Sequence, residues 1–277
     1  MAETTSTTIA NLLPTLIGSS SEAFEKASNL RDTVSVYQMD NSTLGIPKLT
    51  TATVVSVSEG EMPGSGEAWT PGTATLTSAK YRVHTLMTDQ AVNRAMKAGK
   101  FDLIEAYGRA AGRALSVKVD KLITALYSGF DAGGGSGSGT TLTSAVYSLG
   151  LTTLLGNAAP EPYTLVCHPL QVQYLLTDLH YTAPAGAVSP QDQQAAYLPP
   201  NIWGTRLVVT PNTVAISSLA TYAAIYSKEA IALGIETEPH IEVERVQDTG
   251  FRFTASMEVA VIEVRGDGGY YFHVKAA

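Results

Sequence analysis

The stretch LTTATVVSVSEGEMPGSGEAWTPGTATLTSAKYRVHTL, residues 49–86, combines two runs typical of β-strands with a long turn between them. Residues 49–58 and 73–86 are rich in β-branched side chains, which favour strands. The segment between them is rich in glycine and proline, which favour turns. Trp69 lies in this segment, and a tryptophan side chain is costly to leave in water. We therefore predict an extended β-hairpin whose tip contacts a partner.

The clearest helical pattern follows, over residues 101–127. Apolar and small residues recur there at steps of three and four, as on one stripe of an α-helix: Phe101, Ile104, Gly108, Ala111, Leu115, Val119, Leu122 and Leu126. Glu105 and Arg109 are four residues apart, in the order that favours an ion pair. An unbroken helix here would be roughly 40 Å long. Gly129 is its expected end, and Gly112 is a point where it could bend or divide.

The remaining segments indicate an α+β protein. Residues 1–48 show no sustained period and predict a loosely structured N-terminal arm. The run GGGSGSG at Gly133–Gly139 is typical of a flexible joint. Helices are then expected near residues 143–155, 169–179 and 217, and strands at 163–167, 206–210, 223–226, 240–246, 252–264 and 270–275. The Gly266-Asp-Gly-Gly turn predicts that the last two strands form a hairpin.

Charge and cysteine content limit the class of protein. The 277 residues include 25 acidic and 18 basic side chains, a net charge of −7, and only 16% of the residues are charged. The single cysteine, Cys167, excludes a disulfide framework within one chain. No segment approaches the ~18 apolar residues of a membrane span, and the N-terminus lacks the basic region of a secretory signal. We therefore expect a protein of a reducing compartment, without a membrane partner, that is stabilised by packing or assembly.

No motif predicts an active site. Gly133–Gly139 is followed by Thr-Thr-Leu, and not by the Gly-Lys-Ser/Thr of a phosphate-binding loop. Cys167 and His168 are neighbours at a predicted strand, so their side chains point to opposite faces and cannot form a thiol–base pair. We interpret Cys167 as a buried structural residue. The five histidines are scattered without metal-ligand spacing. We expect no catalytic residues, no cofactor and no metal.

The charges are unevenly distributed along the chain. Residues 91–130 contain seven basic and three acidic side chains, whereas residues 236–248 contain five acidic side chains and one basic. One interpretation is that both are ordinary solvated faces, which pair within or between subunits. The alternative is that the long helix, through Arg109 and Arg113, faces a polyanion.

The order of the segments carries a resemblance. VSVSEGEMPGSGEAWTPGTATLTSAKYRVHTLMTDQAV (residues 55–92) joins two strands through a proline-containing tip, with an acidic-glycine step at Glu59 and a lysine, Lys80, on the second strand. VDKLITALYSGF ends the predicted helix, and AIYSKEAIALGIETEPHIEVERV and MEVAVIEVRGDGGYYFHVK are the closing strands. In this order they resemble the extended loop, spine helix and closing strands of the major capsid protein of tailed bacteriophages. The likeness covers most of residues 49–277, and the fold, the Hong Kong phage-type capsid fold, is shared with encapsulins.

The resemblance implies an α+β capsid fold with an N-terminal arm, an extended β-hairpin loop, a long spine helix, and peripheral and axial domains. The corresponding segments are the arm at 1–48, the loop at 49–86, the peripheral domain at 87–130 and 241–277, and the axial domain at 131–240. It also implies contacts to an adjacent subunit through four loop residues: Glu59, Glu61, Trp69 and Lys80.

The function implied is structural. Copies of the chain would form hexamers and pentamers of an icosahedral virion capsid around double-stranded DNA, bound without sequence specificity, after assembly in the host cytoplasm. Portal, scaffolding and decoration proteins are the other expected partners. Because no long charged N-terminal scaffolding segment is present, scaffolding would come from a separate protein or not be needed. No covalent crosslink is assumed. The alternatives are an encapsulin-type nanocompartment shell with an enzyme cargo, and an α+β enzyme.

Overall fold

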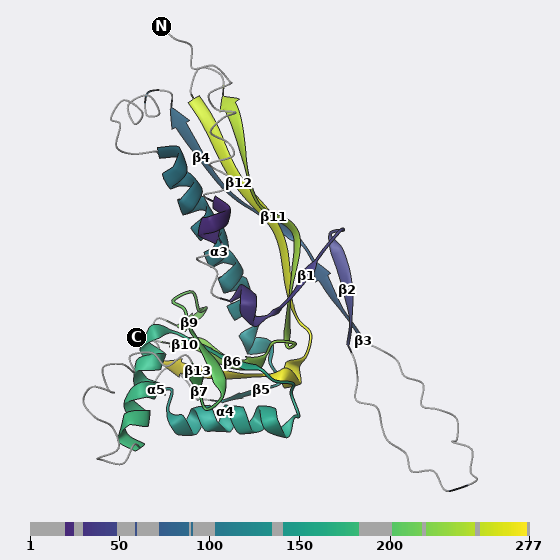
Figure 1. Ribbon diagram of the computed structural model, residues 1–277, viewed down its shortest axis with the longest axis vertical. Helices are drawn as coiled ribbons and strands as arrows, with labels where there is room; N and C mark the ends of the chain where they lie inside the picture. Colours follow the sequence, from purple (N-terminus) through teal and green to yellow (C-terminus); the bar gives the residue numbers. More distant parts are fainter. Residues whose placement is uncertain are drawn as a thin grey trace.

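The computed structural model describes residues 20–24, 30–48, 59, 72–88, 90, 103–134, 141–182, 201–217, 220–246 and 250–275. They form an elongated molecule, in which a long helix and a long sheet run side by side and a second α+β module lies at one end (Figure 1). The α-helices named in Figure 1 are α3 (Leu103–Ala125), α4 (Ser144–Gly156) and α5 (Pro169–Thr182). Short 3-10 helices are η1 (Arg31–Thr33), η2 (Tyr127–Gly129) and η3 (Gly266–Gly268).

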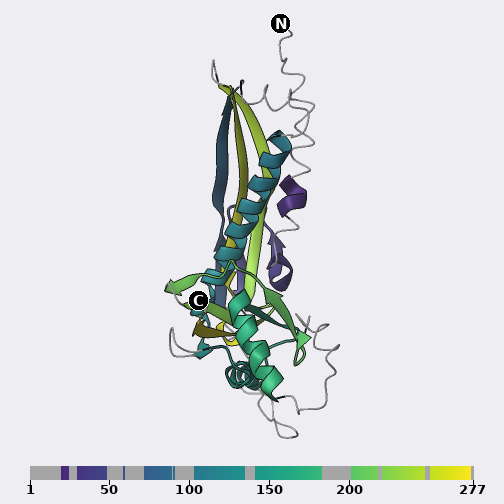
Figure 2. The ribbon, with the colours of Figure 1, turned by 90° about the vertical axis from the view of Figure 1, so that its left-hand side faces the viewer.

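The long sheet has the strand order β1-β11-β12-β4. Its strands are β1 (Ser35–Gln38), β4 (Ala79–Thr88), β11 (Ile231–Val246) and β12 (Gly250–Glu263). All pairs are antiparallel except β1 and β11, which are parallel. Every second residue of β12 from Phe251 to Val259 is buried in the core under α3, as strand alternation requires. The helix therefore covers one face of this sheet along its length (Figure 2).

Helix α3 confirms most of the predicted stripe. Ala111, Leu115 and Val119 are buried, and Glu105 and Arg109 form the expected ion pair at 3.2 Å. After Val119 the buried positions are Ile123 and Tyr127, while Leu122 and Leu126 are only partly buried against the same core. Because an α-helix has 3.6 residues per turn, residues four apart are displaced slightly around the helix axis. After Val119 the row of buried residues therefore lies one position later than the predicted stripe. α3 ends at Ala125, before the expected Gly129.

The sequence suggested that α3 could bend or divide at Gly112, but it does neither. The helix runs through it without a break. A Cβ atom at Gly112 would lie 2.3 Å from the carbonyl oxygen of Ser20. The glycine therefore allows the helical segment 20–24 to lie against α3.

The second sheet has the order β5-β13-β10-β6-β8-β7, with β9 paired to β10. Its strands are β5 (Ala132–Gly134), β6 (Tyr163–Cys167), β7 (Asn201–Ile202), β8 (Thr205–Val209), β9 (Ala215–Ser217), β10 (Ala220–Ser227) and β13 (Gly269–Lys275). Ala224 and Tyr226 of β10 lie in the core with α3, whereas Ala223 and Ile225 lie in a second core with α4. Because both faces are covered, β6 is buried at all five positions.

A hairpin of β2 (Thr43–Lys48) and β3 (Gly72–Thr77) lies on the face of the long sheet opposite to α3. Its Ile46 and Leu76 pack with Ala232 of β11 and Ala260 of β12. Residues 31–48, expected to be loosely structured, therefore contain η1, β1 and β2. The predicted strand at 49–58 lies outside the described residues.

The single strand predicted at 73–86 is two strands in two sheets. β3 pairs with β2, and β4 pairs with β12. Ser78 separates the two strands: its backbone N–H donates to the carbonyl oxygen of Ser42 at 2.8 Å and its hydroxyl donates to Glu236. These local bonds replace the ladder bonds of a continuous strand.

Three further expectations were wrong. Residues 215–217 form β9 and not a helix. Gly133 and Gly134, expected in the flexible joint, pair with β13 as part of β5. The turn at 266–269 does not join a hairpin, because β12 lies in the long sheet and β13 in the second sheet. Burial of Tyr270, Phe272 and Val274 in the core under α4 explains the placement of β13.

The other predicted elements are confirmed within a few residues: α4, α5, β6, β8 and β10. The boundary expected at residue 240 falls inside β11, and β13 belongs to the sheet of the preceding module.

Candidate assembly surfaces

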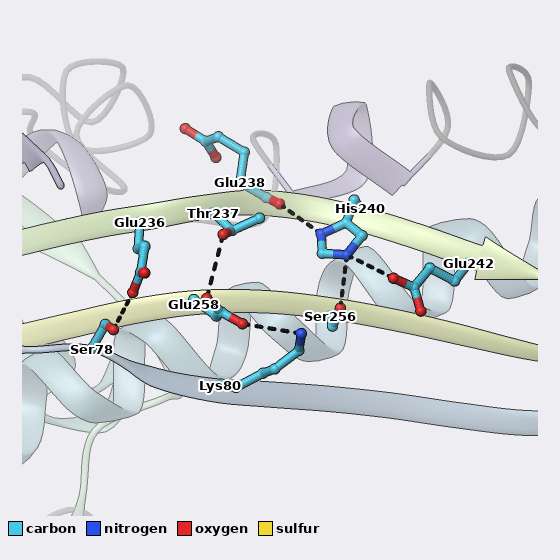
Figure 3. Close-up of polar contacts among 9 residues, drawn as sticks. All are labelled: Ser78, Lys80, Glu236, Thr237, Glu238, His240, Glu242, Ser256 and Glu258. Carbon is cyan, nitrogen blue, oxygen red and sulfur yellow. Dashed lines mark hydrogen bonds and ion pairs between the residues drawn. The ribbon is translucent and has the colours of Figure 1, made fainter. Parts of the chain in front are cut away.

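The face of the long sheet that points away from α3 carries a row of polar contacts, shown in Figure 3. Lys80 of β4 lies 3.0 Å from Glu258 of β12, its register partner, through Nζ and Oε1. The other carboxylate oxygen of Glu258 accepts a hydrogen bond from the Thr237 hydroxyl at 3.5 Å. Lys80 is thus paired within its own chain, with 38% of its side chain exposed.

His240 of β11 lies at the centre of a second group in Figure 3. Its Nε2 is 3.1 Å from the Ser256 hydroxyl and 3.5 Å from a Glu242 carboxylate oxygen. A catalytic Ser-His-acid triad places the serine and the acid on opposite ring nitrogens, whereas here both approach the same one. Ser256 is only 1% exposed, so a substrate could not reach its hydroxyl. The group is arranged for cross-strand pairing and not for nucleophilic catalysis.

The acidic residues of β11 are largely paired within the chain. Glu238 and Arg31 are 2.7 Å apart, and Glu244 and Arg252 are 3.2 Å apart. Glu236 accepts the hydrogen bond from Ser78. These contacts support the interpretation of residues 236–248 as a solvated face that pairs internally, and each exposed pair contributes little to stability.

Helix α3 presents a basic face to solvent. Its exposed basic side chains are Arg109, Arg113, Lys118 and Lys121. Arg109 pairs with Glu105, and the Lys118 ammonium lies 4.9 Å from the ring centroid of Tyr81. Within the described part of the chain, Arg113 and Lys121 have no acidic partner within 4.0 Å. The helix therefore keeps a net positive surface.

Of the predicted loop contacts, Glu59 is an exposed turn residue, while Glu61 and Trp69 lie outside the described residues.

Cys167 is buried at the end of β6, as predicted, and burial raises the pKa of its thiol to about 12. Burial also lowers the pKa of His168.

Among the described residues, no group of three or more His, Cys, Asp or Glu side chains could hold a metal ion. None of the helices in the described ranges is long and apolar enough to cross a membrane.

The outer surface of α4 is uncharged, and its exposure was not predicted from the sequence. Leu149 and Leu155 are more than half exposed there, as is Trp203 nearby. The available signal was the composition of residues 144–156, which contain no charged side chain.

Chains of similar fold occur in solved phage capsids and a virus-like particle. A capsid structure of cyanophage P-SCSP1u has 13% identity and a TM-score of 0.66, over 88% of this chain and 87% of that chain. A structure from Mycobacterium phage Che8 has 18% identity and a TM-score of 0.64, over 84% of each chain. A virus-like particle from Pyrococcus furiosus has 10% identity and a TM-score of 0.61, over 94% of this chain and 98% of that chain. The fold is therefore that of a capsid-shell subunit.

A family model described as phage capsid protein matches residues 73–271, which include most of both sheets. The chain belongs to this family of phage capsid proteins, and its fold is that of the capsid chains above. No curated protein matches it.

Proposed function

We propose that copies of this protein form hexamers and pentamers that close into the icosahedral capsid of a tailed phage, around its double-stranded DNA. The observation that carries the proposal is the family match over residues 73–271, which extends from β3 through most of the long sheet and the second module. Portal, scaffolding and decoration proteins would complete the particle, which would assemble in the host cytoplasm. The chain itself would have no catalytic role.

We assign the two sheets to the two domains of a capsid subunit. α3 and the long sheet would form the peripheral domain, and the second sheet with α4 and α5 the axial domain near the capsomer centre. β13 joins the axial domain in this proposal, because it pairs with β10. Residue 240 would not mark a boundary, since β11 is continuous there.

The extended loop would contact an adjacent subunit through Glu59, Glu61 and Trp69, with Lys80 at its base. Replacing residues 60–71 by a short Gly-Ser linker keeps the pairing of Lys48 with Gly72. We expect this variant to fold but not to assemble. Normal particles from it, seen by electron microscopy, would contradict the role of the loop.

The basic face of α3 would lie toward a polyanion, with packaged DNA as the natural candidate. Arg109 and Arg113 support this, because both are exposed and they lie one turn apart. Arg109→Glu with Arg113→Glu should lower the retention of the protein on a polyanion matrix and reduce its salt dependence. The matched control is Arg109→Lys with Arg113→Lys, which keeps the charge. Equal retention of both variants would contradict the proposal.

A further inference from the structure

Two segments of the chain cross side by side from the long sheet to the second sheet. Residues 127–131 lead from α3 to β5, and residues 263–268 lead from the end of β12 to β13. A backbone hydrogen bond joins them, which the Asp131 N–H donates to the Gly266 carbonyl oxygen at 3.2 Å. These two segments are called the junction below, and their packing affects how firmly the two sheets are held together.

Each segment of the junction carries a carboxylate that lies against the backbone of the other segment. A Cβ atom at Gly129 would lie 2.3 Å from Oε2 of Glu263. A Cβ atom at Gly266 would lie 2.7 Å from both carboxylate oxygens of Asp131. Because both backbone positions are glycine, the carboxylates can approach this closely. Glu263 and Asp131 are thus a carboxylate pair that spans the junction from both sides.

The charges around the pair neutralise it only in part. Lys48, at the end of β2, is near enough to favour the ionised form of Glu263. Arg265 is engaged by Asp267, through contacts of 3.2 and 3.0 Å, and Glu229 is the other acidic group that acts on Arg265. In the described part of the chain, neither member of the pair has a basic side chain within 4.0 Å.

We propose that Glu263 and Asp131 form a pH-sensitive lock, which holds the junction together when Glu263 is protonated and loosens it when both carboxylates are ionised. Two carboxylates in one site repel each other when both are charged. Desolvation by burial and then the charge of Asp131 raise the pKa of Glu263, in agreement with this geometry. The lock lies within a single chain, so it does not depend on the assembly of a shell.

The direction of the pH dependence follows from proton linkage. A carboxyl group whose pKa is raised by folding binds its proton more tightly in the native protein than in the unfolded chain. The stabilisation from Glu263 is therefore fully present below its ordinary pKa of 4.5 and is lost as the pH rises through the higher pKa of the folded state. At neutral pH the charged pair weakens the junction.

Glu263→Gln tests the lock, because it removes the charge and keeps the size of the side chain. The melting temperature of this variant should exceed that of the wild type at pH 7 and match it at a pH below 4.5. The matched control is Glu229→Gln, which removes an exposed charge beside Arg265 and should not raise the melting temperature at pH 7. A Glu263→Gln variant without higher stability at pH 7, or with the same gain at both pH values, would overturn the proposal.

A double-variant cycle tests the pairing itself. Asp131→Asn removes the same repulsion from the other side of the junction. The gain in unfolding free energy from the two substitutions together should therefore be smaller than the sum of their separate effects at pH 7. Additive effects would overturn the pairing of Glu263 with Asp131.

Hydrogen exchange shows where the lock acts. At pH 7 the amide protons of residues 127–131 and 263–268 should exchange more slowly in Glu263→Gln than in the wild type, because local opening of the junction becomes rarer. At a pH below 4.5 the two proteins should exchange at the same rate. Equal exchange of these amides in the two proteins at pH 7 would overturn the lock.

Discussion

The hydroxyl groups of Thr33 and Tyr226 lie 2.8 Å apart in the interior of the protein. Thr33 belongs to η1, near the start of the described chain, and Tyr226 to β10 of the second sheet. The Thr33 hydroxyl also donates to the Leu30 carbonyl at 2.7 Å, so it accepts from Tyr226. Both residues are buried, and the bond joins segments 193 residues apart. It connects the beginning of the chain to the core shared by α3 and the second sheet.

Tyr226→Phe removes this bond, together with the longer one of 3.5 Å that the Tyr127 hydroxyl donates to Tyr226, and keeps the ring, which packs against Tyr127 and Phe130. We expect a loss of about 1 kcal/mol in the free energy of unfolding, measured by urea denaturation of dissociated subunits. The control is Tyr222→Phe, because the Tyr222 hydroxyl has no hydrogen bond within the described part of the chain. Equal losses of stability for the two substitutions would show that the hydrogen bond between Thr33 and Tyr226 does not contribute to stability.

Cys167 should be unreactive in the folded protein. Burial raises the pKa of its thiol to about 12, so almost no thiolate forms at pH 8. A thiol reagent such as DTNB is expected to find no reactive group in the native protein and one per chain after unfolding in guanidinium. Rapid labelling of the native protein would show that β6 is not buried as described.

Gly112→Ala should destabilise the protein, although alanine normally stabilises a helix by ~1 kcal/mol relative to glycine. The added Cβ would lie 2.3 Å from the Ser20 carbonyl oxygen, so the segment 20–24 must move. Gly156→Ala is the control, because nothing lies within 4 Å of a Cβ there. Thermal unfolding of dissociated subunits compares the two; a higher melting temperature for Gly112→Ala would contradict the close packing.

Asp178 should make part of the stability dependent on pH. Hydrogen bonds from Ser144, including one from its backbone N–H at 2.6 Å, lower the pKa of this carboxyl group below its ordinary value of 3.8. A carboxyl group whose pKa is lowered by folding stabilises the protein above the pKa of the unfolded chain. That contribution is lost as the pH falls through the lower pKa of the folded state.

Asp178→Asn should therefore reduce stability at pH 7, where the carboxylate is ionised, and have a smaller effect at a pH below the pKa of the folded carboxyl group, where it is protonated. Unfolding curves at the two pH values measure this difference. If the substitution has the same effect at both pH values, the loss of stability does not come from the ionised Asp178 carboxylate that binds Ser144 at the start of α4.

Local patterns in the sequence predicted much of the fold. The stripe on α3 predicts a helix by itself, because its apolar residues repeat with the helical period. The short, continuous apolar run of β6 is typical of a strand covered on both faces. The order of these elements was sufficient to suggest a capsid fold. The partner of a strand is a different matter, because it depends on distant residues. β4 pairs with β12, about 170 residues further on, and nothing in the sequence of β4 identifies that partner.

The functional surfaces were only partly predictable for a similar reason. The basic face of α3 follows from composition, and Arg109 and Arg113 could be named from spacing alone. The pairing of Lys80 with Glu258 could not, since it depends on the register between β4 and β12. The exposed face of α4 was missed because leucines at helical spacing usually indicate a core. Exposure of Leu149 and Leu155 becomes visible only when the sheet contacts of α4 are known.

The central claim is that copies of this chain form a closed shell, and electron microscopy of the purified protein tests it most directly. The protein would be expressed alone and together with a candidate scaffolding protein, and each preparation imaged beside size-exclusion chromatography. The account predicts closed particles, or rings of five and six subunits, in at least one preparation. A protein that stays monomeric in both, at all concentrations tested, would contradict it.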